Sequence, residues 1–234
     1  LCRGFLEKDI RVGNALLDMY SKCSRPEKAL EVLEELPIRD VVSWNTMIGN
    51  YVQRGRYDEP IVCLELMQSE GIAPDVVTYI CILRVCRDTK NIDKGKQIHE
   101  TVTSGMLDKD IMLATTLVDM YTNCGSLQKA QKVLEDCPVK DLVAWNTLIA
   151  GYAEHGHLYG ILNCFDSMKV EGIFADRVTF SSILKACGNV GAIEKGREIH
   201  REVVNRGLLG KDIVLGNAVV DMYAKCGIMT KAQN

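Results

Sequence analysis

Asp40–Val41–Val42–Ser43–Trp44–Asn45–Thr46 is the stretch that decides the fold, because it returns 101 residues later as Asp141–Leu142–Val143–Ala144–Trp145–Asn146–Thr147. A second stretch, residues 13–20, matches residues 114–121 and again residues 216–223, at offsets of 101 and then 102. Self-similarity at a fixed period indicates a repeat protein, in which each unit packs mainly against its neighbours.

Aspartates mark the ends of the units. They are Asp9, Asp40, Asp75, Asp110, Asp141, Asp176 and Asp212. The units between them span 10–40, 41–75, 76–110, 111–141, 142–176 and 177–212, with lengths of 31, 35, 35, 31, 35 and 36 residues. Residues 1–9 read as the tail of an earlier unit and 213–234 as a truncated one. We therefore expect a piece of a longer protein whose uncapped ends associate.

Each full unit is predicted to form two helices. In the first helix of unit 10–40, apolar residues recur at three- and four-residue steps and predict one buried stripe. The stripe consists of Val12, Leu16, Met19 and Cys23. The second helix is expected to begin near Pro26 and to end before Pro37, since proline fits a first turn but cannot continue a helix. In the next unit the predicted helices lie near 43–54 and 57–69. Stacked pairs of this kind form an all-α solenoid, a curved superhelix with a concave groove.

Composition narrows the function classes. No apolar run approaches the roughly 20 residues of a membrane span. The net charge of −3 argues against avid non-specific nucleic-acid binding. Most of the ten cysteines recur with the repeat, and Cys137 aligns with Leu36, which predicts core packing in a reducing compartment. No C-x-x-C occurs, so neither zinc nor any other metal or cofactor is expected.

These units resemble pentatricopeptide repeats of the PLS class found in plant organelles. The 35-residue unit beginning Val-Val-Ser-Trp-Asn-Thr-Met-Ile resembles the P repeat of that class. The 31-residue unit with Gly-Asn-Ala-Leu-Leu-Asp-Met-Tyr-Ser-Lys-Cys resembles the S repeat, and residues 183–187 with 194–200 resemble the L repeat. The resemblance covers the chain as one array, 1–234: L tail 1–9, S 10–40, P 41–75, L 76–110, S 111–141, P 142–176, L 177–212 and truncated S 213–234. It implies a right-handed α-solenoid.

The resemblance also implies a one-base-per-repeat reader of RNA. In the family, the fifth residue and the last residue of a repeat face the groove and together address one base. The fifth residues are Asn14, Asn45, Ile80, Thr115, Asn146, Ser181 and Asn217, and the last residues are Asp40, Asp75, Asp110, Asp141, Asp176 and Asp212. The second residues, which sandwich the base in the family, include Val42, Val77, Val143, Val178 and Val214.

Hydrogen-bond chemistry predicts which base each of these residue pairs would bind. A carboxylate only accepts, so Asp favours uracil or guanine, whose Watson–Crick edges carry an imino N–H. Asn suits the smaller pyrimidine, and Thr or Ser leaves room for a purine. The pairs of Asn14, Asn45 and Asn146 thus predict U, that of Thr115 predicts G, and that of Ser181 predicts G more weakly. Ile80 should not discriminate. With N-terminal repeats on the 5′ side, as the resemblance implies, the expected core is 5′-UUNGUG-3′, followed by a pyrimidine at Asn217.

Structural alternatives stay open for the same residues. An Asp before a helix is a common cap, and Asn or Thr in a first turn can bond the backbone. The valines could instead pack between helices. Trp44 and Trp145 are expected to pack between helices rather than to stack on bases, and His99 and His200 are expected to be structural.

The predicted function is sequence-specific binding of single-stranded RNA, as the recognition array of an organellar RNA-processing or C-to-U editing factor with helper proteins. The chain itself is not expected to be an enzyme: His200–Arg201–Glu202 matches the H-x-E of zinc deaminases, but the required P-C-x-x-C does not follow. By resemblance the protein acts in a mitochondrion or chloroplast, with no membrane partner. The alternative is a protein-interaction scaffold.

Overall fold

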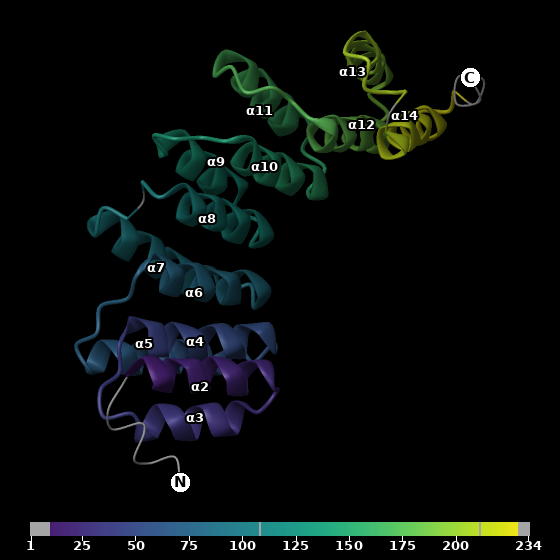
Figure 1. Ribbon diagram of the computed structural model, residues 1–234. Helices are drawn as coiled ribbons and strands as arrows, with labels where there is room; N and C mark the ends of the chain where they lie inside the picture. Colours follow the sequence, from purple (N-terminus) through teal and green to yellow (C-terminus); the bar gives the residue numbers. More distant parts are fainter. Residues whose placement is uncertain (1–9, 108, 211, 229–234) are drawn as a thin grey trace. The chain divides into compact units, whose positions relative to one another are not determined.

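A computed structural model describes residues 10–107, 109–210 and 212–228 (Figure 1). These residues form thirteen helices and no strand. The first helices of the units are α2 (Ile10–Lys22), α4 (Val41–Gln53), α6 (Val76–Asp88), α8 (Ile111–Asn123), α10 (Leu142–Glu154), α12 (Arg177–Val190) and α14 (Ile213–Lys225). The second helices are α3 (Pro26–Glu35), α5 (Asp58–Ser69), α7 (Ile92–Ser104), α9 (Leu127–Asp136), α11 (Leu158–Val170) and α13 (Ile193–Asn205).

The chain divides into two compact units, Leu1–Thr116 and Leu117–Asn234, and the division falls inside α8. In the first unit the first helices of successive repeats pack side by side, α2 on α4 and α4 on α6, and each also contacts the second helix of its own repeat (Figure 1). In the second unit α10 packs on α12 and α12 on α14 in the same way. The predicted all-α fold of stacked helix pairs is confirmed.

Helix ends follow the sequence signals. Pro26 occupies the first turn of α3, which ends at Glu35, before Pro37. Gly71, which follows α5, has a φ of +76°, in the left-handed region that glycine enters without strain. In the second repeat the helices span 41–53 and 58–69 rather than 43–54 and 57–69, since Asp40 caps the chain at Val41.

Close approach of a neighbouring side chain accounts for two of the glycines inside helices. A Cβ added to Gly13 would lie 2.3 Å from a methyl of Leu36, and one added to Gly196 would lie 2.5 Å from the sulfur of Met222. Both distances are far below van der Waals contact. At both positions glycine lets the neighbouring side chain approach closely, which offsets its low helix propensity.

The buried stripe predicted for the first helix is wrong for α2. Val12 and Met19 are 39% and 41% exposed, and Cys23 lies in an exposed turn after the helix. The buried residues of α2 are instead Gly13 and Leu17.

The same stripe is buried in α14, where its counterparts are Leu215, Val219 and Met222. There α12, the first helix of the preceding repeat, packs alongside. Among the described residues no preceding first helix covers α2. The periodicity thus identified a face that only the neighbouring repeat buries, and a single helix could not reveal that dependence.

The cysteine prediction is correct in part. Five of the nine described cysteines, Cys63, Cys86, Cys137, Cys164 and Cys187, are buried, and none of the nine forms a disulfide. Cys23 is exposed, and Cys124 and Cys226 are only half-buried, because all three follow the last turn of a first helix rather than its packed middle.

No helix in the described part of the chain is long and apolar enough to cross a membrane.

Candidate nucleic-acid interface

The aspartate at the end of each repeat caps the next first helix. Asp75 accepts a hydrogen bond from the backbone N–H of Thr78 at 2.9 Å, and its own N–H donates to the Thr78 hydroxyl at 3.2 Å. This reciprocal capping box recurs at Asp40 with Ser43 and at Asp176 with Thr179. The capping interpretation of these aspartates is therefore correct.

The same carboxylates also contact the fifth residue of their own repeat. The side-chain amide of Asn45 donates to Asp75 Oδ1 at 3.0 Å, although 30 residues separate the two. The amides of Asn14 and Asn146 donate to Asp40 and Asp176, each at 3.2 Å. The structure thus brings together three of the residue pairs that the sequence analysis selected.

A third side chain, which the sequence analysis missed, completes each cluster. The Thr78 hydroxyl lies 2.6 Å from Asn45 Oδ1, to which it donates. The Ser43 and Thr179 hydroxyls bind Asn14 and Asn146 in the same way, at 2.8 and 2.7 Å. These hydroxyl residues are completely buried. Each comes from the repeat after its asparagine, so every cluster joins two successive repeats.

The carboxylate sets the orientation of the amide, and the hydroxyl bond to the amide oxygen holds it there. A turned amide would aim its oxygen at the carboxylate and its NH₂ at the hydroxyl, and oxygen against carboxylate is repulsive. The amide nitrogen therefore faces the Asp, with its second N–H still unused. In the described residues the Oδ2 atoms of Asp75 and Asp176 accept no hydrogen bond within the protein. The clusters of Asn45 and Asn146 can thus offer a ligand one donor beside one acceptor, whereas the Asn14 amide also reaches Asp40 Oδ2 at 3.5 Å.

A pattern in the sequence could have revealed the third residue. Each asparagine at a fifth position, apart from Asn217, is followed in the next repeat by a hydroxyl residue at position three: Ser43, Thr78 or Thr179. The fifth positions without asparagine, 80, 115 and 181, are followed by Leu113, Ala144 and Leu215.

The remaining predicted pairs differ from these clusters. Ile80 is buried, with 8% exposure, and offers no hydrogen bond. The Thr115 hydroxyl donates to the backbone oxygen of Ile111 at 2.7 Å, the backbone bond anticipated as its structural alternative. The carboxylate of Asp141 accepts the N–H of Ala144 at 2.8 Å and has no capping box.

In unit 177–212, no hydrogen bond joins Ser181 to Asp212 within the described residues. Asp212 accepts the N–H groups of Val214 and Leu215 and lies 3.5 Å from the guanidinium of Arg177. Asn217 is exposed on α14. Asp9 lies outside the described residues.

Hydrogen bonding keeps the cluster carboxylates ionised. Burial alone would raise the pKa of Asp75, but the Thr78 N–H, the Asn45 amide and the Thr78 hydroxyl together hold that pKa below its ordinary value. Asp40 and Asp176 have lowered pKa values through the equivalent donors. At neutral pH all three present an acceptor only.

The second-position valines lie beside this surface and are open to solvent. Their exposed fractions range from 46% at Val178 to 63% at Val143. Val42, Val77 and Val214 fall between these values. Packing between helices of the described chain is therefore not their role, and their apolar surfaces remain available.

The two tryptophans and His200 serve the scaffold. Trp44 is 3% exposed and donates its indole N–H to Glu70, at the end of α5, at 3.2 Å. Trp145 makes the same bond to Glu171 at 3.1 Å, so the packing interpretation is correct. His200 bonds the hydroxyl of Tyr223 at 3.0 Å. The described residues contain no cluster of His, Cys, Asp and Glu that could hold a metal ion.

Family models match most of these repeats. A model described as "PPR repeat family" matches residues 39–88 and 140–189, and one described as "PPR repeat" matches residues 14–41 and 178–208.

Curated relatives from Arabidopsis thaliana carry the same repeats. The pentatricopeptide repeat-containing protein At5g27110 is 36% identical over 96% of this chain and 32% of its own length. The mitochondrial protein At3g09040 is 34% identical over 97% of this chain and 22% of its length. The chloroplastic protein At1g08070 is 35% identical over 96% and 31%. This chain thus spans a third or less of the length of these relatives.

Solved structures agree with the fold. The maize pentatricopeptide repeat protein PPR10, in complex with an 18-nt psaJ RNA element, superposes with a TM-score of 0.77 at 21% identity, over 97% of this chain and 34% of PPR10. The nuclear protein-only RNase P 2 of Arabidopsis thaliana gives a TM-score of 0.57 at 13% identity, over 68% of this chain and 37% of that one. At these identities the likeness concerns the fold.

Proposed function

The chain belongs to the pentatricopeptide repeat family, and from that premise we propose that it binds single-stranded RNA, one base per repeat. The related fold of PPR10 is solved with an RNA element bound, which supports this class of ligand. The RNA must be single-stranded, because its bases have to be unstacked before their edges reach side chains on a helical repeat.

The observation that carries the proposal is the locked Asn–Asp cluster. In Asn45 with Asp75, one N–H donor stands beside one ionised acceptor at a fixed spacing. Uracil presents the complement, an imino N–H donor beside a carbonyl acceptor. Cytosine presents an acceptor at the imino position, which the carboxylate would repel. Guanine presents the same edge, but Asn leaves less room for a purine than Thr or Ser does, which favours the smaller uracil. The three clusters are therefore proposed to select U.

The proposed site reads 5′-UUNGUG-3′ from the first full repeat onward. The clusters of Asn14, Asn45 and Asn146 give the three U positions, and the buried Ile80 gives the unselective third base. Thr115 with Asp141 gives G at the fourth base. The sixth base, at Ser181, is the weakest G, because Asp212 contacts Arg177 rather than Ser181.

The whole protein is proposed to be a PLS-class factor of RNA processing, of the C-to-U editing type, acting in a mitochondrion or chloroplast. Relatives with about a third identity to this chain have names that place them in one or the other organelle, which supports the location. The present chain is its recognition array. The deamination chemistry and the helper proteins would belong to the rest of the assembly.

Selection from a random single-stranded RNA pool tests the proposal. The selected sequences should carry U where the three clusters place it and no preference at the third base. A titration with 5′-UUNGUG-3′ embedded in a longer strand should show clear preference over the same sequence in a duplex. Equal affinity for strand and duplex, or a pool without U at those positions, would refute base reading.

A matched pair of variants separates reading from general binding. Asn45→Ser keeps Asp75 and should move only the second base from U toward G. Arg84→Gln removes an exposed charge from α6 without touching a cluster, and should leave base preference unchanged. Loss of affinity for all sequences alike in Asn45→Ser would mean that residue 45 only supports packing.

A further inference from the structure

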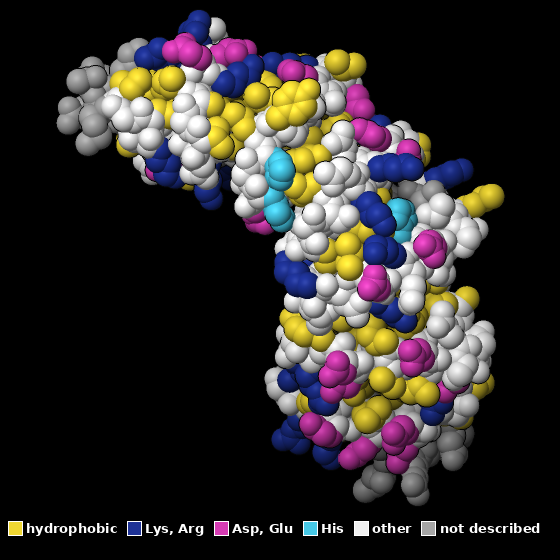
Figure 2. Space-filling model, turned by 180° about the vertical axis from the view of Figure 1, so that it is seen from behind, with side chains coloured by type: hydrophobic (Ala, Val, Ile, Leu, Met, Phe, Trp, Pro, Cys, Tyr) yellow, Lys and Arg dark blue, Asp and Glu magenta, His cyan; other side chains and the backbone are white. Residues whose placement is uncertain are grey.

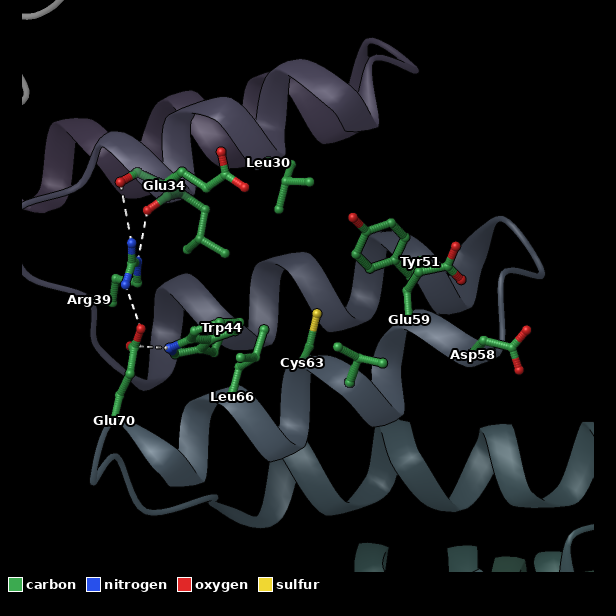
Figure 3. A pocket seen from close by; sticks show the side chains of 12 residues that line it. Leu30, Glu34, Arg39, Trp44, Tyr51, Asp58, Glu59, Cys63, Leu66 and Glu70 are labelled. Carbon is green, nitrogen blue, oxygen red and sulfur yellow. Dashed lines mark hydrogen bonds and ion pairs between the residues drawn. The ribbon is translucent and has the colours of Figure 1, made fainter.

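A groove in the first unit lies between the second helices α3 and α5, with α4 at its floor (Figure 3). Its volume is about 540 Å³, within the range of roughly 300–1,000 Å³ usual for ligand sites. Leu30, Val62 and Leu66 line it, although 37%, 51% and 48% of their surfaces are exposed. Exposed apolar side chains around one hollow indicate a binding surface rather than a packing defect.

The two ends of the groove differ. At one end Arg39 forms an ion pair with Glu70 and donates to the carbonyl oxygens of Leu33 and Glu34 of α3, while Glu70 also accepts the indole N–H of Trp44 (Figure 3). This network joins α3, α4 and the end of α5 rigidly. At the other end lie Tyr51, Asp58 and Glu59 (Figure 3).

The second unit contains a copy of this region that serves as a comparison. Gln131, Asn163 and Ser167 stand where the first unit has Leu30, Val62 and Leu66. The apolar lining is therefore a property of the first copy and not of the repeat.

The tyrosine beside the groove also loses its partner in the first copy. The hydroxyl of Tyr152, in the second unit, donates to Gln131 at 2.5 Å. Its counterpart Tyr51 is 5% exposed, and in the first copy Leu30 replaces that glutamine. The Tyr51 hydroxyl has no hydrogen-bond partner among the described residues. The Tyr51 ring is buried while its hydroxyl is open to solvent at the hollow, where it can bond an incoming group.

The helices that flank the groove in the first copy are also more acidic than their counterparts in the second copy. Helix α3 carries four glutamates and one lysine, and α5 carries three acidic residues and no basic one. The counterpart helices in the second unit have balanced charges. Helix α9 carries two lysines and two acidic residues, and α11 carries one lysine and one acidic residue. Figure 2 shows acidic side chains around hydrophobic ones on the lower part of the molecule. Of the carboxylates that line the groove, those of Glu34 and Asp58 have no cationic partner in the described structure.

We propose that this groove binds an amphipathic helix of a partner protein, whose large apolar side chains enter between α3 and α5 and whose lysines or arginines face the carboxylates. A helix laid into a groove between helices is an established mode of recognition. Nucleic acid is excluded as the occupant because its phosphates would meet the acidic flanks. The Tyr51 hydroxyl would bond a polar group carried by the apolar face.

A defined peptide tests the surface without knowledge of the natural partner. The probe is a fluorescein-labelled synthetic peptide of about 18 residues, long enough to form a helix, with Leu and Trp on one face and Lys on the other. A peptide of the same composition in scrambled order is its control. Fluorescence anisotropy should show saturable one-to-one binding of the amphipathic peptide, which weakens with added salt, and much weaker binding of the scrambled one.

Variants built from the chain's own second copy locate the binding. The triple change Leu30→Gln, Val62→Asn and Leu66→Ser should weaken the peptide at least about tenfold, as the loss of central anchors does. The control triple Val139→Asn, Val170→Asn and Val204→Asn removes exposed valines from the second unit and should leave affinity unchanged.

Two further changes guard against loss of folding. Glu34→Gln with Asp58→Asn should remove most of the salt dependence, and Tyr51→Phe should weaken binding a few-fold, while helicity by circular dichroism stays constant. Equal affinities of the groove triple and the control triple would overturn the proposal. So would equal binding of the scrambled peptide, or competition by single-stranded RNA, which would place the probe on the RNA face.

Discussion

Removal of one buried hydroxyl, by Thr78→Val, isolates what holds the reading position together. Valine keeps the shape of threonine, but the bond from the Asp75 N–H (3.2 Å) is lost. The one hydroxyl proton, which Asn45 Oδ1 (2.6 Å) and Asp75 Oδ1 (2.9 Å) share, is lost as well. Each such bond stabilises by about 1 kcal/mol net, so the expected destabilisation is about 2 kcal/mol. Because a repeat array need not unfold in one step, hydrogen exchange of the amides at the start of α6 is the appropriate assay, together with urea unfolding.

RNA binding should report the same loss. Without the hydroxyl the Asn45 oxygen loses its donor and only the carboxylate holds the amide. The preference for U at the second base should therefore fall about tenfold, the equivalent of 1.4 kcal/mol, while the first and fifth bases keep theirs. The matched control is Ala144→Ser, which introduces the residue that occupies the equivalent position 43. It should complete a capping box with Asp141 and stabilise the second unit by roughly 0.5–1 kcal/mol. Unchanged exchange and base preference in Thr78→Val would refute the locking role.

Three other outcomes follow from the geometry. The pKa of Asp75 is lowered in the folded chain, so the stability that its carboxylate contributes is complete above the ordinary aspartate pKa of about 3.9. That stability is lost as the pH falls through the lowered value. The urea midpoint should therefore fall less steeply between pH 6 and pH 3 in Asp75→Asn than in the unchanged chain. Gly151→Ala should destabilise the chain by about 1–3 kcal/mol in thermal unfolding, since its Cβ would lie 2.4 Å from a methyl of Thr122. Gly49→Ala should stabilise it by up to about 1 kcal/mol, because Gly49 has open space around it and alanine already occupies the equivalent position 150. Thr115→Asn should move the fourth selected base from G toward U, and equal weakening of all RNAs would show that residue 115 only supports its helix.

Sequence periodicity predicted the helices because their apolar spacing and their punctuation agree. Pro26, Pro37 and the repeat-ending aspartates mark boundaries that chemistry enforces locally, and those boundaries fall within two residues of expectation. The apolar spacing could not show which face of α2 is buried. Val12 and Met19 have the spacing of a core stripe, but the neighbour that buries such a stripe belongs to another repeat.

The candidate site was predictable as a set of positions and not as a set of contacts. Asn45 and Asp75 followed from their places in the repeat, whereas the sequence analysis did not single out Thr78. Only coordinates show that its hydroxyl lies within 2.6 Å of an amide 33 residues earlier. The groove at α3 and α5 escaped prediction for a related reason: Leu30, Val62 and Leu66 are unremarkable one by one, and they become a surface only when three helices bring them together.

The hydroxyl bridge has a consequence for anyone who would reprogram such an array. Asn45 belongs to one repeat and Thr78 to the next, so the residue proposed to select a base also forms a hydrogen bond between two successive repeats. Exchange of asparagine for another fifth residue would therefore alter the stiffness of that joint together with the base chosen. An exchangeable module would therefore need three matched residues: the fifth and last residues of one repeat and the third residue of the next. Where the fifth residue is asparagine, that third residue would be Ser or Thr.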